Sequence, residues 1–128
     1  MPNASPIACA AALAVIEVIE EEGLADRAEA IGGKVVKTME GMAETDPRIG
    51  EVRGLGAMVG VELVKDRESR DPDADLTKAI TNAALEQGLI ILSCGSYGNV
   101  LRLMVPLTAS DELIEEGLEA LGRAFAAV

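Results

Sequence analysis

The sequence contains no histidine and no tryptophan, and only one tyrosine and one phenylalanine occur in its 128 residues. Without histidine, the chain cannot form a Ser-His-Asp triad, a Cys-His pair or a zinc site with imidazole ligands. Basic residues are also scarce, since 11 lysines and arginines stand against 22 acidic residues and the net charge is −11. Nucleic-acid binding requires clusters of basic residues, so the composition argues against a nucleic-acid partner.

Cysteine is rare and long hydrophobic segments are absent. Cys9 and Cys94 each lie in an apolar run, and we expect both to be buried, reduced thiols in a cytoplasmic protein. The apolar run Ile7–Ile16 has no basic leader of the secretory type, and it ends at Glu17 before it could span a bilayer. We therefore expect no membrane partner.

The residues that are present fit one domain, covering positions 1–128. The chain is 49% apolar but only 2% aromatic, which predicts a core of Ala, Val, Leu and Ile. The mean hydropathy of +0.26 is high for a free-standing chain of this size. This value suggests that another chain or domain covers some of its apolar surface.

Two helices are predicted at the start of the chain. The first is Pro6–Glu22, with Ser5 as its cap and Gly23 at its end. Every residue of Ile7–Ile16 is apolar, so we expect this helix to be buried on all sides. The second is Leu24–Met42, whose apolar stripe comprises Leu24, Ala28, Ile31, Val35, Met39 and Met42.

Glycines mark close approaches and turns in this region. Gly32-Gly33 lies inside the second helix, where each glycine costs about 1 kcal/mol relative to alanine, so another backbone is expected to approach there. A strand, Ala57–Val64, follows with Val59, Val61 and Leu63 on one face, whereas Gly60 and Glu62 face solvent or another subunit. The glycines of the preceding Val52–Gly56 do not form a dinucleotide fingerprint, because that motif requires a helix where this strand begins; they indicate a tight turn between two strands.

A charged surface loop is predicted at Asp66–Asp75. Because this segment lacks the glycine and the terminal glutamate of an EF-hand calcium loop, we expect no metal site there. Asp75 is expected to cap a helix over Leu76–Gln87. The last helix is expected to open within Pro106–Glu112, with acidic residues in its first turn, and its buried stripe comprises Ile114, Leu118, Leu121 and Phe125.

A β-hairpin is predicted within Gly88–Leu107, where the apolar runs Leu89–Cys94 and Val100–Val105 flank a turn rich in glycine. Arg102 interrupts the second run and shares a strand face with Val100 and Met104. Either this face is open to solvent, or Arg102 is a rigidly held guanidinium fork that binds a carboxylate. Spacing alone does not choose between them.

The predicted order is helix, helix, strand, strand, helix, strand, strand, helix. This order indicates an α+β domain in which an antiparallel or mixed sheet of about four strands is covered by helices.

The chain from Pro6 onward resembles the C-terminal small domain of the class III pyridoxal-phosphate (PLP) aminotransferases, and is most similar to their 4-aminobutyrate branch. The segments that carry the resemblance are Pro6–Glu17, Val52–Leu63 and Gly88–Thr108, the last containing Cys94-Gly, Tyr97-Gly-Asn-Val, Arg102 and Pro106-Leu-Thr. The resemblance implies a fold-type I enzyme, dimeric, that moves an amino group from an ω-amino acid to 2-oxoglutarate. It also implies that Arg102 binds the substrate carboxylate.

The resemblance does not extend to the large PLP-binding domain. Lys34, Lys37, Lys65 and Lys78 match none of the cofactor-binding positions and are expected to lie on the surface. We therefore expect no catalytic residue, no bound PLP and no transamination from this chain alone. Two alternatives remain open: a stand-alone carboxylate-binding module, or an interaction module that forms a homo-oligomer or docks on a large PLP domain through Pro6–Glu22.

Overall fold

A computed structural model describes residues 5–128. Its elements are α1 (Pro6–Glu21), α2 (Leu24–Thr45), β1 (Ile49–Leu55), β2 (Met58–Leu63), α3 (Ala74–Glu86), β3 (Leu92–Cys94), β4 (Val100–Met104) and α4 (Asp111–Ala126). Their order is the predicted one, and the α+β class is confirmed.

The sheet is antiparallel throughout, in the strand order β1-β2-β4-β3. The predicted hairpin is present, because β3 pairs with β4: Leu92 lies opposite Arg102, and Cys94 lies opposite Val100. Its turn uses two glycines with positive φ, Gly95 at 87° and Gly98 at 65°. The first arm is shorter than predicted, since only Leu92–Cys94 of the expected run forms a strand.

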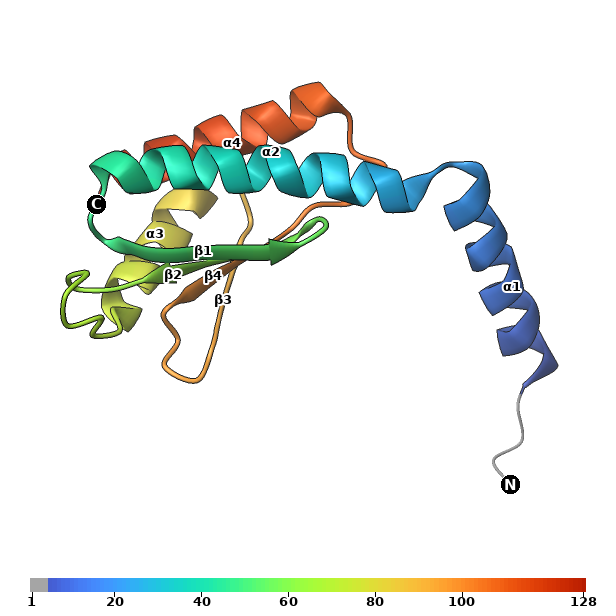
Figure 1. The fold of residues 1–128 in the computed structure, drawn as a ribbon, viewed down its shortest axis with the longest axis horizontal. Coiled ribbons are helices and arrows are strands. Elements are labelled where there is room, and N and C mark those ends of the chain that lie inside the picture. Colours follow the sequence, from blue (N-terminus) through green and yellow to red (C-terminus); the bar gives the residue numbers. More distant parts are fainter. Residues whose placement is uncertain (1–4) are drawn as a thin grey trace.

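One face of the sheet is covered by helices (Figure 1). α2 packs against β1 and β2, α3 packs against β2, β3 and β4, and α4 packs against α2 and α3. The apolar stripes predicted for the helices and for Ala57–Val64 point into the space between the sheet and these helices. The buried core comprises Ile31, Val35, Met39, Ile49, Val59, Val61, Leu63, Ile80, Leu101, Leu103, Ile114, Leu121 and Phe125.

Gly32 allows α2 to lie directly on the turn between β1 and β2. A Cβ atom at this position would lie 1.9 Å from the carbonyl oxygen of Gly56, so no side chain fits without a backbone shift. The predicted backbone approach is therefore confirmed for Gly32. It is wrong for Gly33, which points into open space.

The first helix forms where it was predicted, but the expectation that it is buried is wrong. No residue of α1 is buried, and the helix projects from the body as an arm (Figure 1). Ile7 and Leu13 are 82% and 63% exposed, and Cys9 is exposed rather than buried. The physical reason is that α1 packs only against α2, the helix that follows it, so nothing in this chain covers its apolar sides.

The start of α3 differs from the prediction, whereas that of α4 agrees with it. α3 begins at Ala74 because the carboxylate of Asp73, rather than that of Asp75, accepts a hydrogen bond from the Leu76 backbone N–H at 2.9 Å. α4 begins at Asp111, after Ser110 caps it, and carries Asp111 and Glu112 in its first turn as expected.

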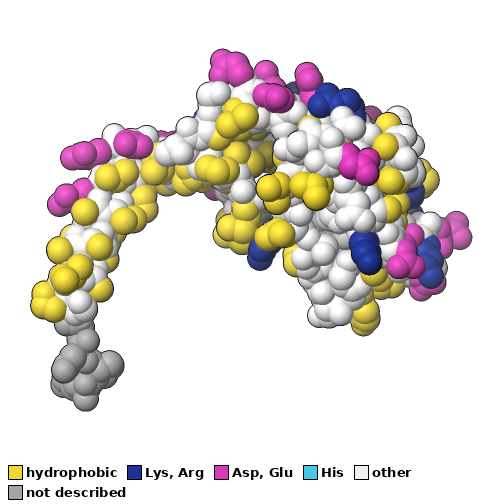
Figure 2. Space-filling view, turned by 180° about the vertical axis from the view of Figure 1, so that it is seen from behind, with side chains coloured by type: hydrophobic (Ala, Val, Ile, Leu, Met, Phe, Trp, Pro, Cys, Tyr) yellow, Lys and Arg dark blue, Asp and Glu magenta, His cyan; other side chains and the backbone are white. Residues whose placement is uncertain are grey.

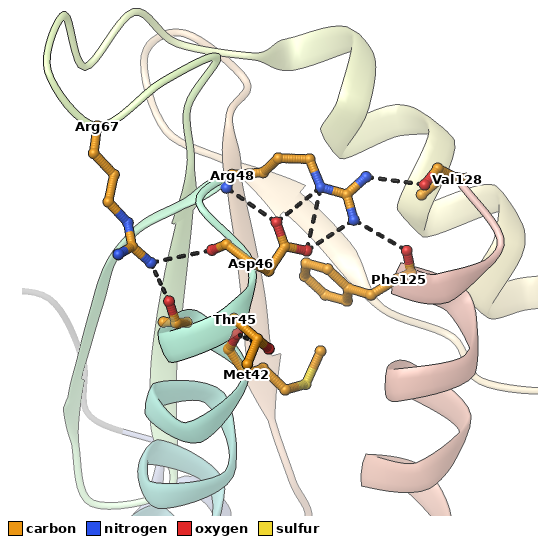
Figure 3. A network of polar contacts seen from close by, with 8 residues as sticks. Met42, Thr45, Asp46, Arg48, Arg67, Phe125 and Val128 are labelled. Carbon is orange, nitrogen blue, oxygen red and sulfur yellow. Dashed lines mark hydrogen bonds and ion pairs between the residues drawn. The ribbon is translucent and has the colours of Figure 1, made fainter.

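Arg48 joins three ends of secondary structure at one edge of the molecule. Its guanidinium lies between the carboxylate of Asp46, which it contacts at 2.8 Å, and the carbonyl oxygens of Phe125 and Val128 (Figure 3). Arg67 donates to the carbonyl oxygen of Asp46 from the opposite side. The hydrogen bond from Arg48 holds the pKa of the Asp46 carboxyl below its ordinary value. The network ties the end of α2 and the start of β1 to the end of α4.

The segment predicted as a charged surface loop is exposed from Lys65 to Asp71. The Asp66 carboxylate accepts hydrogen bonds from the backbone N–H groups of Glu68 and Ser69, which close the turn. Within residues 5–128 no three acidic or cysteine side chains are grouped so that they could hold a metal ion. None of the helices in the same range combines the length and hydrophobicity that crossing a bilayer requires.

Candidate functional site

The sheet has a second face that no helix covers, which we call the open face. Side chains alternate between the two faces along each strand. Because Val59, Val61, Leu101 and Leu103 are buried in the core, the residues that alternate with them point to the open face. The open face comprises Glu51, Arg53, Leu55, Met58, Gly60, Glu62, Leu92, Cys94, Val100, Arg102 and Met104, of which Val100 is buried and Cys94 half-buried. Several of its apolar members are well exposed, among them Leu55 at 77% and Met104 at 62%.

Arg102 stands in the middle of this face. It pairs with Gly60 on β2 and with Leu92 on β3, so strands flank it on both sides. Its predicted position opposite Leu101 and Leu103 is confirmed, and its side chain is exposed. The site residue predicted from the sequence is thus held on a central strand of the sheet, where its backbone is fixed.

Arg102 differs from every other arginine in the chain in having no protein partner within residues 5–128. Arg27, Arg48, Arg53, Arg67, Arg70 and Arg123 all form a hydrogen bond or an ion pair. A guanidinium has five N–H donors that a carboxylate can accept in pairs. The donors of Arg102 are therefore free for an external anion or for water.

Arg102 also borders a groove of about 520 Å³. The groove lies between Gly88–Leu92, the end of β4 and α4, and its apolar walls include Leu92, Met104 and Leu113. Glu116 and Arg123 on α4 are the other charged residues that line it. A small ligand with an apolar body and one negatively charged end would suit these walls. The sequence did not reveal this groove, because the groove is the space left between α4 and the β3 edge in the folded chain.

Next to Arg102, a second arginine is fully engaged. Arg53 donates to the carboxylates of Glu51 at 2.9 Å and Glu62 at 3.1 Å, and Arg70 lies 3.8 Å from Glu51. Sequence reasoning placed Glu62 on the correct face of its strand but missed its partner. The alternation of Glu51 and Arg53 was the available signal, although only the strand register shows that Glu62 meets them.

The lysines lie away from the groove. Lys34 forms an ion pair with Glu115 at 2.7 Å, and this hydrogen bond raises the pKa of its amine, which keeps it protonated. Lys37, Lys65 and Lys78 are exposed, as predicted, and none of the four lines the groove that Arg102 borders. No lysine is therefore placed to act as a nucleophile beside Arg102.

Comparison with known proteins shows a consistent family match. The family model described as "Aminotransferase class-III" matches residues 3–125. 5-Aminovalerate aminotransferase DavT of Pseudomonas putida is 50% identical over 124 residues, which are 97% of this chain and 29% of that protein. 4-Aminobutyrate aminotransferase GabT of Escherichia coli is 49% identical over 121 residues, which are 94% of this chain and 28% of that protein.

Solved structures agree with the sequence match. A Bacillus anthracis aminotransferase superimposes with a TM-score of 0.87 at 36% identity, over 97% of this chain and 29% of that one. An amine transaminase from an uncultivated Pseudomonas species, solved in its PLP-bound form, superimposes with a TM-score of 0.83 at 34% identity, over 95% and 28% of the two chains. The chain thus spans under a third of the length of these relatives.

Proposed function

Because this chain belongs to the class-III aminotransferases, we propose that it is the C-terminal small domain of an ω-amino acid:2-oxoglutarate aminotransferase of the 4-aminobutyrate type. In this proposal Arg102 binds the substrate carboxylate. The observation that carries it is the free guanidinium of Arg102, held on a central strand at the border of an apolar groove. 4-Aminobutyrate and 5-aminovalerate, named in the relatives, share a carboxylate and differ in the length of an apolar chain.

The strength of such contacts limits what this segment can do alone. A hydrogen bond to a charged group contributes about 1.5–3 kcal/mol net. Even millimolar binding requires about 4.1 kcal/mol. Arg102 therefore orients the carboxylate end of a substrate, while other groups of the enzyme supply the rest of the affinity.

The residues described here do not suit PLP. Lys34 is held protonated by Glu115, and the other lysines lie apart from the groove and from Arg102. We place the groups that hold PLP in the part of the relatives' length that this chain does not span. In this proposal residues 1–128 contribute substrate recognition and the chemistry belongs to the large domain.

The exposed helix α1 supports docking on that large domain. Apolar side chains are visible along the arm in Figure 2. Ile7, Leu13 and Ile16 belong to this helix, and Ile16 is 52% exposed. An apolar helix without a cover in its own chain is typical of a surface that another domain or subunit buries. We propose that α1 packs on the large PLP-binding domain of an oligomeric enzyme. We place this enzyme in the cytoplasm, where free thiols such as those of Cys9 and Cys94 persist.

A chimera tests this assignment. This chain replaces the matching 121-residue segment of E. coli GabT, and transamination between 4-aminobutyrate and 2-oxoglutarate is measured with PLP present. We expect activity from the chimera, and none from GabT without the segment or from this chain alone. A folded chimera that binds PLP but is inactive would contradict the proposal. Transamination by the isolated chain would also contradict it. The same holds if the isolated chain with PLP shows a visible absorption band that survives dialysis and disappears when one particular lysine is substituted.

A further inference from the structure

Glu62 contacts Arg53 and lies diagonally across from Arg102 on the open face. Arg53, Gly60 and Arg102 form one row across β1, β2 and β4, and Glu62 lies two residues beyond Gly60 on the same face. Diagonal neighbours of this kind are separated by about 7–8 Å, a distance that long side chains bridge. The 3.1 Å contact between Arg53 and Glu62 shows that Glu62 spans one such diagonal. Arg102 stands in the same relation to Glu62 on the other side of β2, because Gly60 pairs with Arg53 on β1 and with Arg102 on β4.

Gly60, which pairs with Arg102, has no side chain, so β2 places no side chain between Glu62 and Arg102. Val100, the partner of Glu62 on β4, lies beside this diagonal, with its Cγ1 atom 3.4 Å from where a Cβ atom of residue 60 would be. Glu62 is therefore a carboxylate of the protein itself that could occupy Arg102 in place of a substrate. In the structure it does not, because Arg53 holds it.

We propose that Arg53 is a positioning residue for carboxylate binding: by engaging Glu62, it leaves the Arg102 guanidinium free. This inference rests on the proposed function, in which Arg102 binds the substrate carboxylate. Glu51 keeps a second partner in Arg70, at 3.8 Å, whereas Glu62 has only Arg53 among the described residues. Loss of Arg53 therefore releases Glu62 in particular.

A role in stability alone explains this cluster poorly. The side chains of Arg53 and Glu51 are 49% and 45% exposed, and ion pairs at such positions add little to folding. The cluster does balance charge on the open face, where the Glu62 carboxylate would otherwise compete for Arg102. Its effect is expected in ligand affinity.

The test uses the full chain, labelled with ¹⁵N, and glutarate as the probe, with Arg102 followed through its side-chain Nε–H signal. In Arg53→Gln we expect this signal to shift before any ligand is added, and the glutarate Kd to rise by about threefold to fivefold, the range of an exposed ion pair. The double variant Arg53→Gln/Glu62→Gln should restore both values. Arg70→Gln is the matched control and should leave both unchanged.

Each result separates this inference from the proposed function. Glutarate binding that is unaffected by Arg102→Gln would overturn the proposed function. If Arg102→Gln abolishes binding but Arg53→Gln does not weaken it, only the role of Arg53 is wrong. The role is also wrong if the double variant stays as weak as Arg53→Gln. Should glutarate binding be too weak to measure, an Arg102 signal that does not move in Arg53→Gln overturns the inference.

Discussion

At the residue scale, Gly32 and Gly33 are neighbours in α2 with opposite surroundings. We expect Gly32→Ala to destabilise the chain by about 1–3 kcal/mol, because the new methyl group would overlap the Gly56 carbonyl and force the backbone to move. Gly33→Ala is the matched control, and it should stabilise the chain by about 0.5–1 kcal/mol because alanine favours a helix interior. Urea unfolding of the two variants measures both changes. Equal effects of the two substitutions would contradict the close approach seen at Gly32.

The Asp46–Arg48 pair makes stability depend on pH. Its hydrogen bond from Arg48 lowers the pKa of Asp46 in the folded state below the ordinary value of 3.8. The pair therefore stabilises the fold above that value, and this contribution is lost as the pH falls through the lowered pKa. At neutral pH we expect Asp46→Asn to cost about 1.5–3 kcal/mol, the worth of hydrogen bonds between charged groups.

The pH series supplies the check on this expectation. Unfolding curves of the wild type and Asp46→Asn should converge in acid, whereas Glu40→Gln, an exposed change on α2, should follow the wild type at every pH. A gap between wild type and Asp46→Asn that stays constant into acid would show that Asp46 acts through packing rather than charge.

The face of Arg102 could be predicted from the sequence, while its freedom from partners could not. Strand alternation alone places Arg102 opposite Leu101 and Leu103, because the period of a strand is two residues. Whether an arginine is paired depends on which strand lies beside it and in which register. Without that register, neither the contact of Arg53 with Glu62 nor the lack of a partner for Arg102 among the described residues could be predicted.

At the element scale, α1 is a helix that contributes nothing to the core of its own chain. We expect the double substitution Leu13→Gln/Ile16→Gln to leave the unfolding free energy of the body almost unchanged, since both side chains are exposed. It should reduce any association of the chain in sedimentation experiments, because it removes apolar surface from the arm. Glu17→Gln/Glu20→Gln on the same helix is the control and should not reduce association.

A monomer that sediments identically with and without the two glutamines would show that α1 does not mediate self-association. Docking on a large domain would then remain to be tested in the chimera. A loss of stability in Leu13→Gln/Ile16→Gln would contradict the exposed position of α1 itself.

The uniform hydrophobicity of α1 predicted the helix correctly and its burial wrongly. Hydrophobic periodicity reports that a helix face is apolar and not what packs on it. The start of α3 was misjudged for a simpler reason. Several aspartates lie near the start of this helix, and the cap is whichever side chain reaches the free N–H groups, here Asp73 rather than Asp75.

At the scale of the whole molecule, the core is complete on one side of the sheet only. The helices bury one face, whereas the open face, the groove beside Arg102 and the α1 arm keep apolar surface exposed. The sequence expectation that apolar surface stays uncovered by this chain, drawn from the mean hydropathy of +0.26, agrees with this distribution. Surfaces of this kind fit a chain that spans 28–29% of the length of the relatives described above.

The central claim is that Arg102 binds the carboxylate of an ω-amino acid, and one comparison of rates tests it most directly. In the chimera with E. coli GabT, kcat/KM is measured for 4-aminobutyrate and for butylamine, which lacks the carboxylate, with and without Arg102→Gln. We predict that the substitution lowers kcat/KM for 4-aminobutyrate by about 10- to 150-fold, the equivalent of one charged hydrogen bond, and leaves butylamine unaffected. An equal loss for both amines, or no loss for either, would contradict the claim.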